Sequence, residues 1–172
     1  MKVSLCTVAF SVAGFVRDWN HCDQVADYLA ISVSIDQPES FRHGNLLSPI
    51  INEMLETIHL SDRPDSMIEI EVLTDSPFVY VVMHVDSSDR IVKFYSDIME
   101  KISQEKVENL YQKALLSKSR HLDLGILGVT THYEACIALR ATEPGRTAIE
   151  VSMALHRFLE VTQCLPISIS SQ

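Results

Sequence analysis

The chain has 172 residues, which suits one domain whose core is large enough to fold without disulfides or a structural metal. Hydrophobic residues make up 47% and charged residues 22% of the sequence, which is a globular composition and excludes a largely disordered chain. The formal net charge of −9 argues against general affinity for nucleic acid or for an anionic membrane.

No segment reads as a targeting or membrane sequence. The first 15 residues lack the apolar run of a signal peptide, and no stretch approaches the roughly 20 apolar residues of a membrane span. The cysteines form no CxxC pair and, with the seven scattered histidines, show no zinc-ligand spacing; they are Cys6, Cys22, Cys136 and Cys164. We therefore expect a cytoplasmic protein with free, mostly buried thiols.

A strand is expected over residues 2–12. After a break at Gly14, apolar residues at helical spacing predict a helix over 18–34, with Trp19 on its apolar side and Asp18 as a cap.

The segment Leu46–Leu60 is the most strongly patterned helix. Seven apolar residues form one broad face: Leu46, Leu47, Ile50, Ile51, Met54, Leu55 and Ile58. Pro49 after Ser48 suits the first turn of a helix with Ser48 as its cap, and a polar lead-in begins near Phe41. Glu53 and Thr57 lie one turn apart on the polar side, as a solvated edge or as part of a binding site.

The rest of the chain alternates hairpins with helices. Met67–Thr74 and Phe78–Val85 predict an antiparallel hairpin whose second strand is more central. Two helices are expected over 91–102 and 104–116, and a third runs to about Tyr133, with Gly125 and Gly128 bracketing its entry. Two strands, over 136–141 and 147–156, flank a turn at Pro144-Gly145, and residues 158–172 show no pattern. This order predicts an α+β fold in one domain, a two-layer sandwich of a mixed, mostly antiparallel sheet covered on one face by helices.

Three blocks, in order and spanning most of the chain, resemble the GHKL nucleotide-binding fold of histidine kinase-like ATPases. The similarity is greatest to bacterial anti-sigma-factor serine kinases and related switch regulators. A W-x-x-C-x-x-x-A-x-[FY]-L-A pattern matches residues 19–30, NEMLETI at 52–58 occupies the frame of NELLENA, and DLGILGVTTHYEA at 123–135 that of GLGLLTMINDYGA.

The resemblance implies roles for residues on three elements. Glu53 is placed as the residue that orients a hydroxyl or water, and Thr57, with Asn52, as the group beside magnesium. Asp86 is placed as the adenine contact, and Asp123, Gly125 and Gly128 at the phosphates. Each also has an ordinary interpretation: Asp86 as a turn residue, Asp123 as a helix cap, and Gly125 as a turn glycine.

Departures from the family pattern fall at the phosphates and the metal. Thr57 replaces an asparagine that would hold magnesium, Asp123 replaces a glycine that would let backbone N–H groups approach phosphate, and no glycine follows Asp86. Two lost hydrogen bonds to charged groups would weaken binding roughly a hundred- to ten-thousandfold. We therefore expect no tight Mg-ATP binding.

The sequence thus favours a signalling regulator with an eroded nucleotide site. It would act by partner switching on a STAS-type antagonist or a sigma-factor-like protein, with no cofactor, as a possible homodimer. One alternative is an active serine/threonine kinase that uses Mg-ATP, with Glu53 as the base-like residue and Thr57 and Asn52 assisting magnesium. Another is a structural or oligomerisation domain without a ligand.

Overall fold

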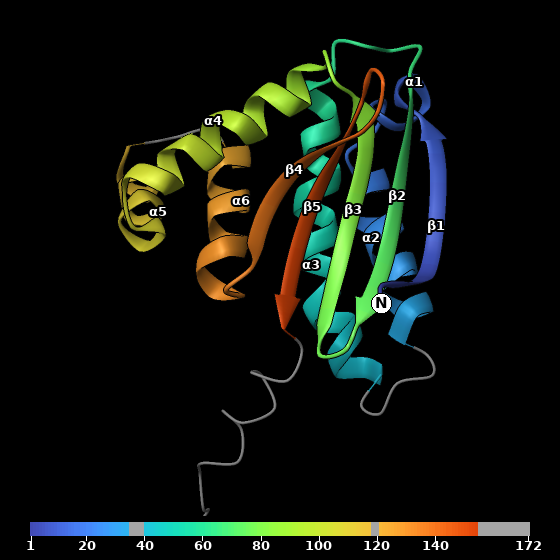
Figure 1. Ribbon diagram of the computed structural model, residues 1–172, viewed down its shortest axis with the longest axis horizontal. Helices are drawn as coiled ribbons and strands as arrows, with labels where there is room; N and C mark the ends of the chain where they lie inside the picture. The colour runs from blue at the N-terminus through green and yellow to red at the C-terminus, as the bar shows by residue number, and fades with distance from the viewer. Residues whose placement is uncertain (35–39, 118–120, 155–172) are drawn as a thin grey trace, which may run out of the picture.

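A computed structural model describes residues 1–34, 40–117 and 121–154 of the chain. Its centre is a five-stranded sheet in the order β1-β2-β3-β5-β4 (Figure 1). The strands are β1 (Val3–Ser11), β2 (Met67–Asp75), β3 (Phe78–Asp86), β4 (Cys136–Glu143) and β5 (Arg146–Ala154). All four neighbouring pairs are antiparallel, so the described residues form an antiparallel sheet and not a mixed one.

Helices lie behind one face of this sheet and beyond its β4 edge (Figure 1). They are α1 (Val12–Phe15), α2 (Asn20–Ser34), α3 (Ser40–Glu56), α4 (Arg90–Gln104), α5 (Val107–Leu116) and α6 (His121–His132), with a 3₁₀ turn η1 (Thr57–Leu60) after α3. In Figure 1, α2 and α3 lie behind the sheet, whereas α4, α5 and α6 lie beyond its β4 side. The α+β class and the two-layer arrangement predicted from the sequence are confirmed. No helix among the described residues is long and apolar enough to cross a membrane.

The alternation of side chains along the strands explains the two layers. On β2, Ile68, Ile70 and Val72 are buried, whereas the glutamates between them are not. Residues directly opposite across an antiparallel pair share a face, so Met83 of β3 and Ile149 of β5 continue the apolar surface of Ile70. The predicted hairpin is confirmed, and β3 is the middle strand of the sheet.

The helix α3 contributes the largest apolar face of the helical layer. Leu47, Ile50, Ile51, Met54 and Leu55 are almost fully buried, and Ile58 follows in η1. The helix begins at Ser40, earlier than the predicted start, and therefore Pro49 lies inside it and not in its first turn. Ser48 is not a cap; its hydroxyl donates to Asp27 of α2 at 2.5 Å. Burial of the apolar face outweighs the backbone hydrogen bond that a proline removes.

The structure corrects three further expectations from the sequence, which concern Trp19, the start of α6 and the burial of the cysteines. Trp19 was expected on the apolar side of the helix, but it precedes α2 and stacks on the His59 ring at the surface. Its side chain is 51% exposed and does not enter the core. The helix α6 begins at His121, so Gly125 lies in its second turn and not at its entry. Among the described cysteines only Cys22 is buried, Cys6 is half-buried and Cys136 exposed, although all three are free thiols.

The turn at Gly145 is confirmed by its φ of +82°, a conformation that favours glycine. Cys164 and the predicted tail, 158–172, lie outside the described residues, as does His156.

Candidate functional site

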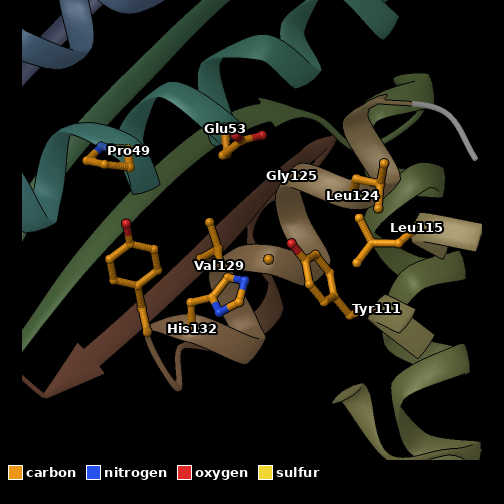
Figure 2. Close-up of a pocket in the computed structure, with 10 residues that line it drawn as sticks. Pro49, Glu53, Tyr111, Leu115, Leu124, Gly125, Val129 and His132 are labelled. Carbon is orange, nitrogen blue, oxygen red and sulfur yellow. The ribbon is translucent and has the colours of Figure 1, made fainter. Parts of the chain in front are cut away.

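A cavity of about 360 Å³ lies between α3, α5 and α6. Figure 2 shows its walls, with Glu53 from α3, Gly125 from α6 and Tyr111 from α5. The lining residues come from α3, from α5 and α6, which follow it much later in the chain, and from the residue just after α6: Pro49, Glu53, Tyr111, Leu115, Leu124, Gly125, Gly128, Val129, His132 and Tyr133. The cavity is therefore created by tertiary packing and not by any one motif.

The contact between Glu53 and Gly125 defines one side of the cavity. A Cβ atom placed on Gly125 would lie 1.6 Å from Oε2 of Glu53 and 2.5 Å from its carboxyl carbon. The carboxylate therefore rests on the bare Cα of Gly125, a position open only because that residue has no side chain. Two residues 72 positions apart in the chain, both singled out from the sequence, meet at this point.

The opposite side of the cavity is aromatic. The Tyr111 and His132 rings meet edge to face, with centroids 5.0 Å apart. Tyr133 also lines the cavity, and the pKa of its phenol is raised by burial and by the negative charge of Glu53. The described lining residues include no lysine or arginine, and the acidic side chain among them is that of Glu53.

Of the other predicted site residues, only Gly128 lines this cavity. Thr57 is fully buried in η1, and its hydroxyl donates to the Met54 carbonyl at 2.6 Å. Asn52 projects from a different side of α3 and donates to Glu56 at 2.8 Å. Asp123 lies in the first turn of α6, where a carboxylate complements the positive end of the helix dipole.

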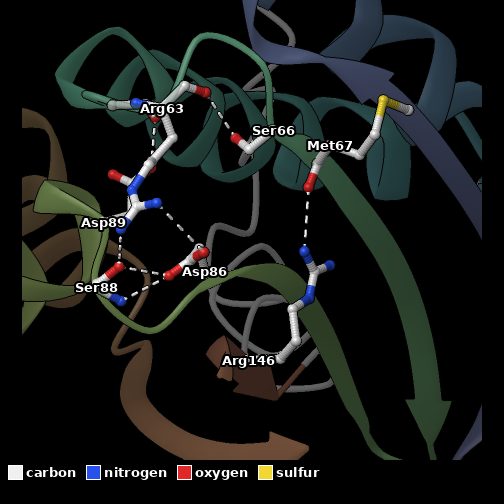
Figure 3. Close-up of polar contacts among 8 residues, drawn as sticks. Arg63, Ser66, Met67, Asp86, Ser88, Asp89 and Arg146 are labelled. Atoms are coloured by element: carbon white, nitrogen blue, oxygen red, sulfur yellow. Dashed lines mark hydrogen bonds and ion pairs between the residues drawn. The ribbon is translucent and has the colours of Figure 1, made fainter. Parts of the chain in front are cut away.

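Asp86 belongs to a separate recess of about 370 Å³ formed by the loop before β2. Its carboxylate accepts hydrogen bonds from the backbone N–H of Ser88 at 2.9 Å and from the Ser88 hydroxyl at 2.7 Å (Figure 3). Arg63 lies 4.0 Å away and also donates to Ser88. These hydrogen bonds and the arginine charge lower the pKa of Asp86. If the roles implied by the resemblance were all in use, Glu53, Thr57, Asp86 and Gly125 would share one cleft. Of these four residues, only Glu53 and Gly125 line the same cavity.

The loop that follows Asp86 ends in a helix cap. Asp89 is buried and accepts from the backbone N–H of Ile91 at 2.9 Å, so α4 starts at once after the strand. Nearby, Arg146 donates to the carbonyl oxygens of Met67 and His84, each at 3.2 Å (Figure 3 shows the Met67 contact). The end of β3 is thus held by its own loop and by β5.

Sequence reasoning missed the aromatic wall of the cavity. In the sequence, Tyr111 fits only as one apolar residue of the expected helix 104–116, and His132 has no partner at a recognisable spacing. Their ring contact depends on α5 packing against α6, which local periodicity does not reveal. The resemblance in the late block was the only sequence signal near this wall.

A second cluster of polar groups lies where α2 meets η1. The Cys22 Sγ lies 3.6 Å from Nε2 of His59, and Trp19 stacks on that ring with centroids 3.8 Å apart. Burial, with the nearby Glu56 charge, raises the pKa of Cys22 to about 12. The thiol is therefore protonated at neutral pH and is not an activated nucleophile.

Within residues 1–34, 40–117 and 121–154, no three His, Cys, Asp or Glu side chains lie close enough together to hold a metal ion. No protein-family model and no curated protein sequence matches the chain. The described residues form an α+β domain with a small cavity between helices, bounded by one carboxylate and an aromatic wall.

Proposed function

We propose that this protein is a regulator of the GHKL type that acts by binding another protein, and that its cavity is not used for ATP. The observation that carries the proposal is the Glu53 carboxylate resting on Gly125. A phosphate group would have to approach the same glycine surface, where it would meet both the bulk and the negative charge of the carboxylate.

The position of Gly125 within α6 supports the same conclusion. Backbone N–H groups bind phosphate at the start of a helix, where the first four have no partner inside the helix. Because α6 begins at His121, the N–H of Gly125 falls beyond that first set. Gly125 therefore allows α6 to pack closely against α3. It does not form part of an anion-binding loop.

The residues do not fit magnesium either. Thr57 has no exposed surface, and its hydroxyl is used by the Met54 carbonyl. Asn52 donates to Glu56, away from the cavity lining. Mg-ATP would therefore lack both its metal ligands and its phosphate contacts, and we expect no phosphoryl transfer by this chain.

The assignment to the GHKL type rests on the order of the elements and on one long-range contact. The NEMLETI block lies on α3, a hairpin follows, and the late glycine block lies on α6. Glu53 and Gly125, which the resemblance places at one site, touch. By the same resemblance the partner is a STAS-type antagonist or a sigma-factor-like protein in a partner-switching circuit.

Titration calorimetry with Mg-ATP tests the nucleotide half of this proposal. We expect no binding to the wild-type chain and no phosphate transfer to a partner. Binding in the low micromolar range would overturn the proposal in favour of the active serine/threonine kinase, with Glu53 as the base-like residue. The double variant Thr57→Asn with Asp123→Gly is expected not to gain binding, because residue 57 points into the core.

The partner half is tested with purified STAS-type proteins and sigma factors from the same genome. We expect one of them to form a complex whose dissociation constant is the same with and without Mg-ATP. A complex that forms or dissociates only when Mg-ATP is added would contradict the proposal, and so would the absence of any complex.

A further inference from the structure

The cavity between α3, α5 and α6 combines an acidic side chain with aromatic and apolar walls. Figure 2 shows Glu53 on one side of the cavity and the rings of Tyr111 and His132 on the other. Much of the remaining lining is hydrocarbon, as at Leu124 and Val129, and the described lining residues include no lysine or arginine. A ligand that fits such walls has an apolar body and one positively charged group.

The charge of Glu53 acts on the aromatic side of the cavity. Burial, and after it the negative charge of Glu53, raise the pKa of the Tyr133 phenol. A cation in the same space is attracted by that charge and by the negative faces of the rings, whereas an anion is repelled. Because a carboxylate accepts up to about four hydrogen bonds, a ligand N–H group can add to the contacts that Glu53 already makes.

We propose that this cavity binds a small organic ammonium ion, with the charged group between Glu53 and the rings and the carbon body against the apolar lining. The volume of about 360 Å³ lies at the small end of the range for ligand pockets, roughly 300–1,000 Å³, which favours a compact ligand. Such a site depends neither on the resemblance to the GHKL fold nor on the identity of a protein partner, so it goes beyond the function proposed for the chain.

A bare metal ion suits the cavity less well than an ammonium ion. A divalent cation such as calcium takes six or more oxygen ligands. In the part of the chain that the structure describes, no three His, Cys, Asp or Glu side chains lie close enough together to hold a metal ion. An ammonium group needs one carboxylate and the aromatic faces, which are the groups that line the cavity.

Three probes with the same phenyl ring and different head groups test the charge preference on the wild-type chain. They are 2-phenylethylammonium, the neutral 2-phenylethanol and the anionic phenylacetate, each titrated into isotope-labelled protein and followed by the NMR signals of the backbone amides. We expect 2-phenylethylammonium to bind with a dissociation constant below about 1 mM and 2-phenylethanol to bind about tenfold more weakly. Phenylacetate should not bind, and the amide signals that move should be those of α3, α5 and α6.

Two pairs of matched variants locate the site. Glu53→Gln keeps the size of the side chain and removes its charge, so the ammonium and the alcohol should then bind equally. Glu56→Gln removes the same charge from α3 outside the cavity lining and should keep the tenfold preference. Tyr111→Leu removes one ring and should weaken binding of the ammonium about tenfold. Tyr28→Leu, at an exposed position of α2 outside the lining, should not weaken it.

Circular dichroism checks that each variant is folded, and the comparison of the three probes on the wild type needs no variant. Equal affinity for the ammonium and the alcohol overturns the proposal, and so does a dissociation constant above about 10 mM for the ammonium. A preference that survives Glu53→Gln, or that Glu56→Gln abolishes as well, also overturns it. The cation would then be bound by the general charge of −9 and not by the cavity.

The Mg-ATP titration is a separate measurement, made on protein without the probes. Binding of Mg-ATP in the low micromolar range contradicts the proposed function and leaves the result with the three probes as it stands. Failure of the ammonium to bind, with no Mg-ATP binding, contradicts only the ammonium site.

Discussion

At the scale of single residues, the packing of Glu53 on Gly125 is the most specific feature of the molecule. The carboxylate lies where a Cβ at residue 125 would be, so the identities of the two residues are coupled. In contrast, a Cβ on Gly128 of the same helix would find Tyr111 at 3.6 Å, which is ordinary contact. The two glycines therefore form a matched pair for mutation. The space beside Gly125 is occupied by a carboxylate, whereas the space beside Gly128 can hold a methyl group.

Gly128→Ala is expected to raise the free energy of unfolding by about 1 kcal/mol, because alanine favours the helix interior. In the wild type, Gly125→Ala is expected to raise the free energy of unfolding by less than this, or to lower it. In the Glu53→Ala background, Gly125→Ala is expected to raise the free energy of unfolding by the same amount as Gly128→Ala. Urea unfolding of the four members of this double-mutant cycle measures the coupling. Equal effects of Gly125→Ala in both backgrounds would disprove the contact.

A residue-scale prediction for pH concerns His59. Burial lowers its pKa, with the Glu56 charge opposing that shift. A histidine whose pKa is lower in the folded state is protonated first in the unfolded state. Its contribution to stability is therefore complete above the unfolded pKa of about 6.5 and is lost as pH falls below it. In His59→Gln the free energy of unfolding should fall less between about pH 7 and pH 5 than in the wild type.

At the scale of elements, α3 connects the core to the cavity. Its buried face includes Met54, with no exposed surface, and its cavity side presents Glu53. Met54→Ala should lower the free energy of unfolding by about 2–5 kcal/mol, because a buried methionine leaves a cavity. Met54→Asp should prevent folding. The exposed Asn45→Ala on the same helix is the control and should change stability by less than about 0.5 kcal/mol. A soluble Met54→Asp protein with an unchanged melting temperature would refute the assignment of this face.

At the scale of the whole molecule, one apolar core joins the sheet to α2, α3, α4 and α6. We therefore expect a single cooperative unfolding transition. Trp19 is the only tryptophan and stacks on His59 of η1, whereas far-UV circular dichroism reports all helices and strands. Denaturation followed by Trp19 fluorescence and by circular dichroism should give the same midpoint. Separate midpoints would show that the helices beyond β4 unfold independently of the rest.

Local patterns in the sequence were enough to predict most of the strands and helices and the arrangement of helices against a sheet. Alternation placed β2 and β3 and gave each strand one buried face, while helical spacing identified the buried side of α3. These are local properties, because the period of a strand or helix fixes which neighbours in sequence share a face. The boundaries were less well predicted. Pro49 suggested a helix start at a position where the helix simply continues, because burial on both sides of the proline outweighs its local preference.

The candidate site could not be predicted in this way, because it is formed by packing between helices. The resemblance to the GHKL pattern singled out Glu53 and Gly125, but their contact depends on α6 packing against α3. That packing separates them from Thr57, which faces the core, and from Asp86, which is held by its own loop. The aromatic wall of the cavity likewise exists only because α5 brings Tyr111 to His132. Periodicity specifies which face of an element is buried, but not which element covers it, and a site between three helices is defined by that choice.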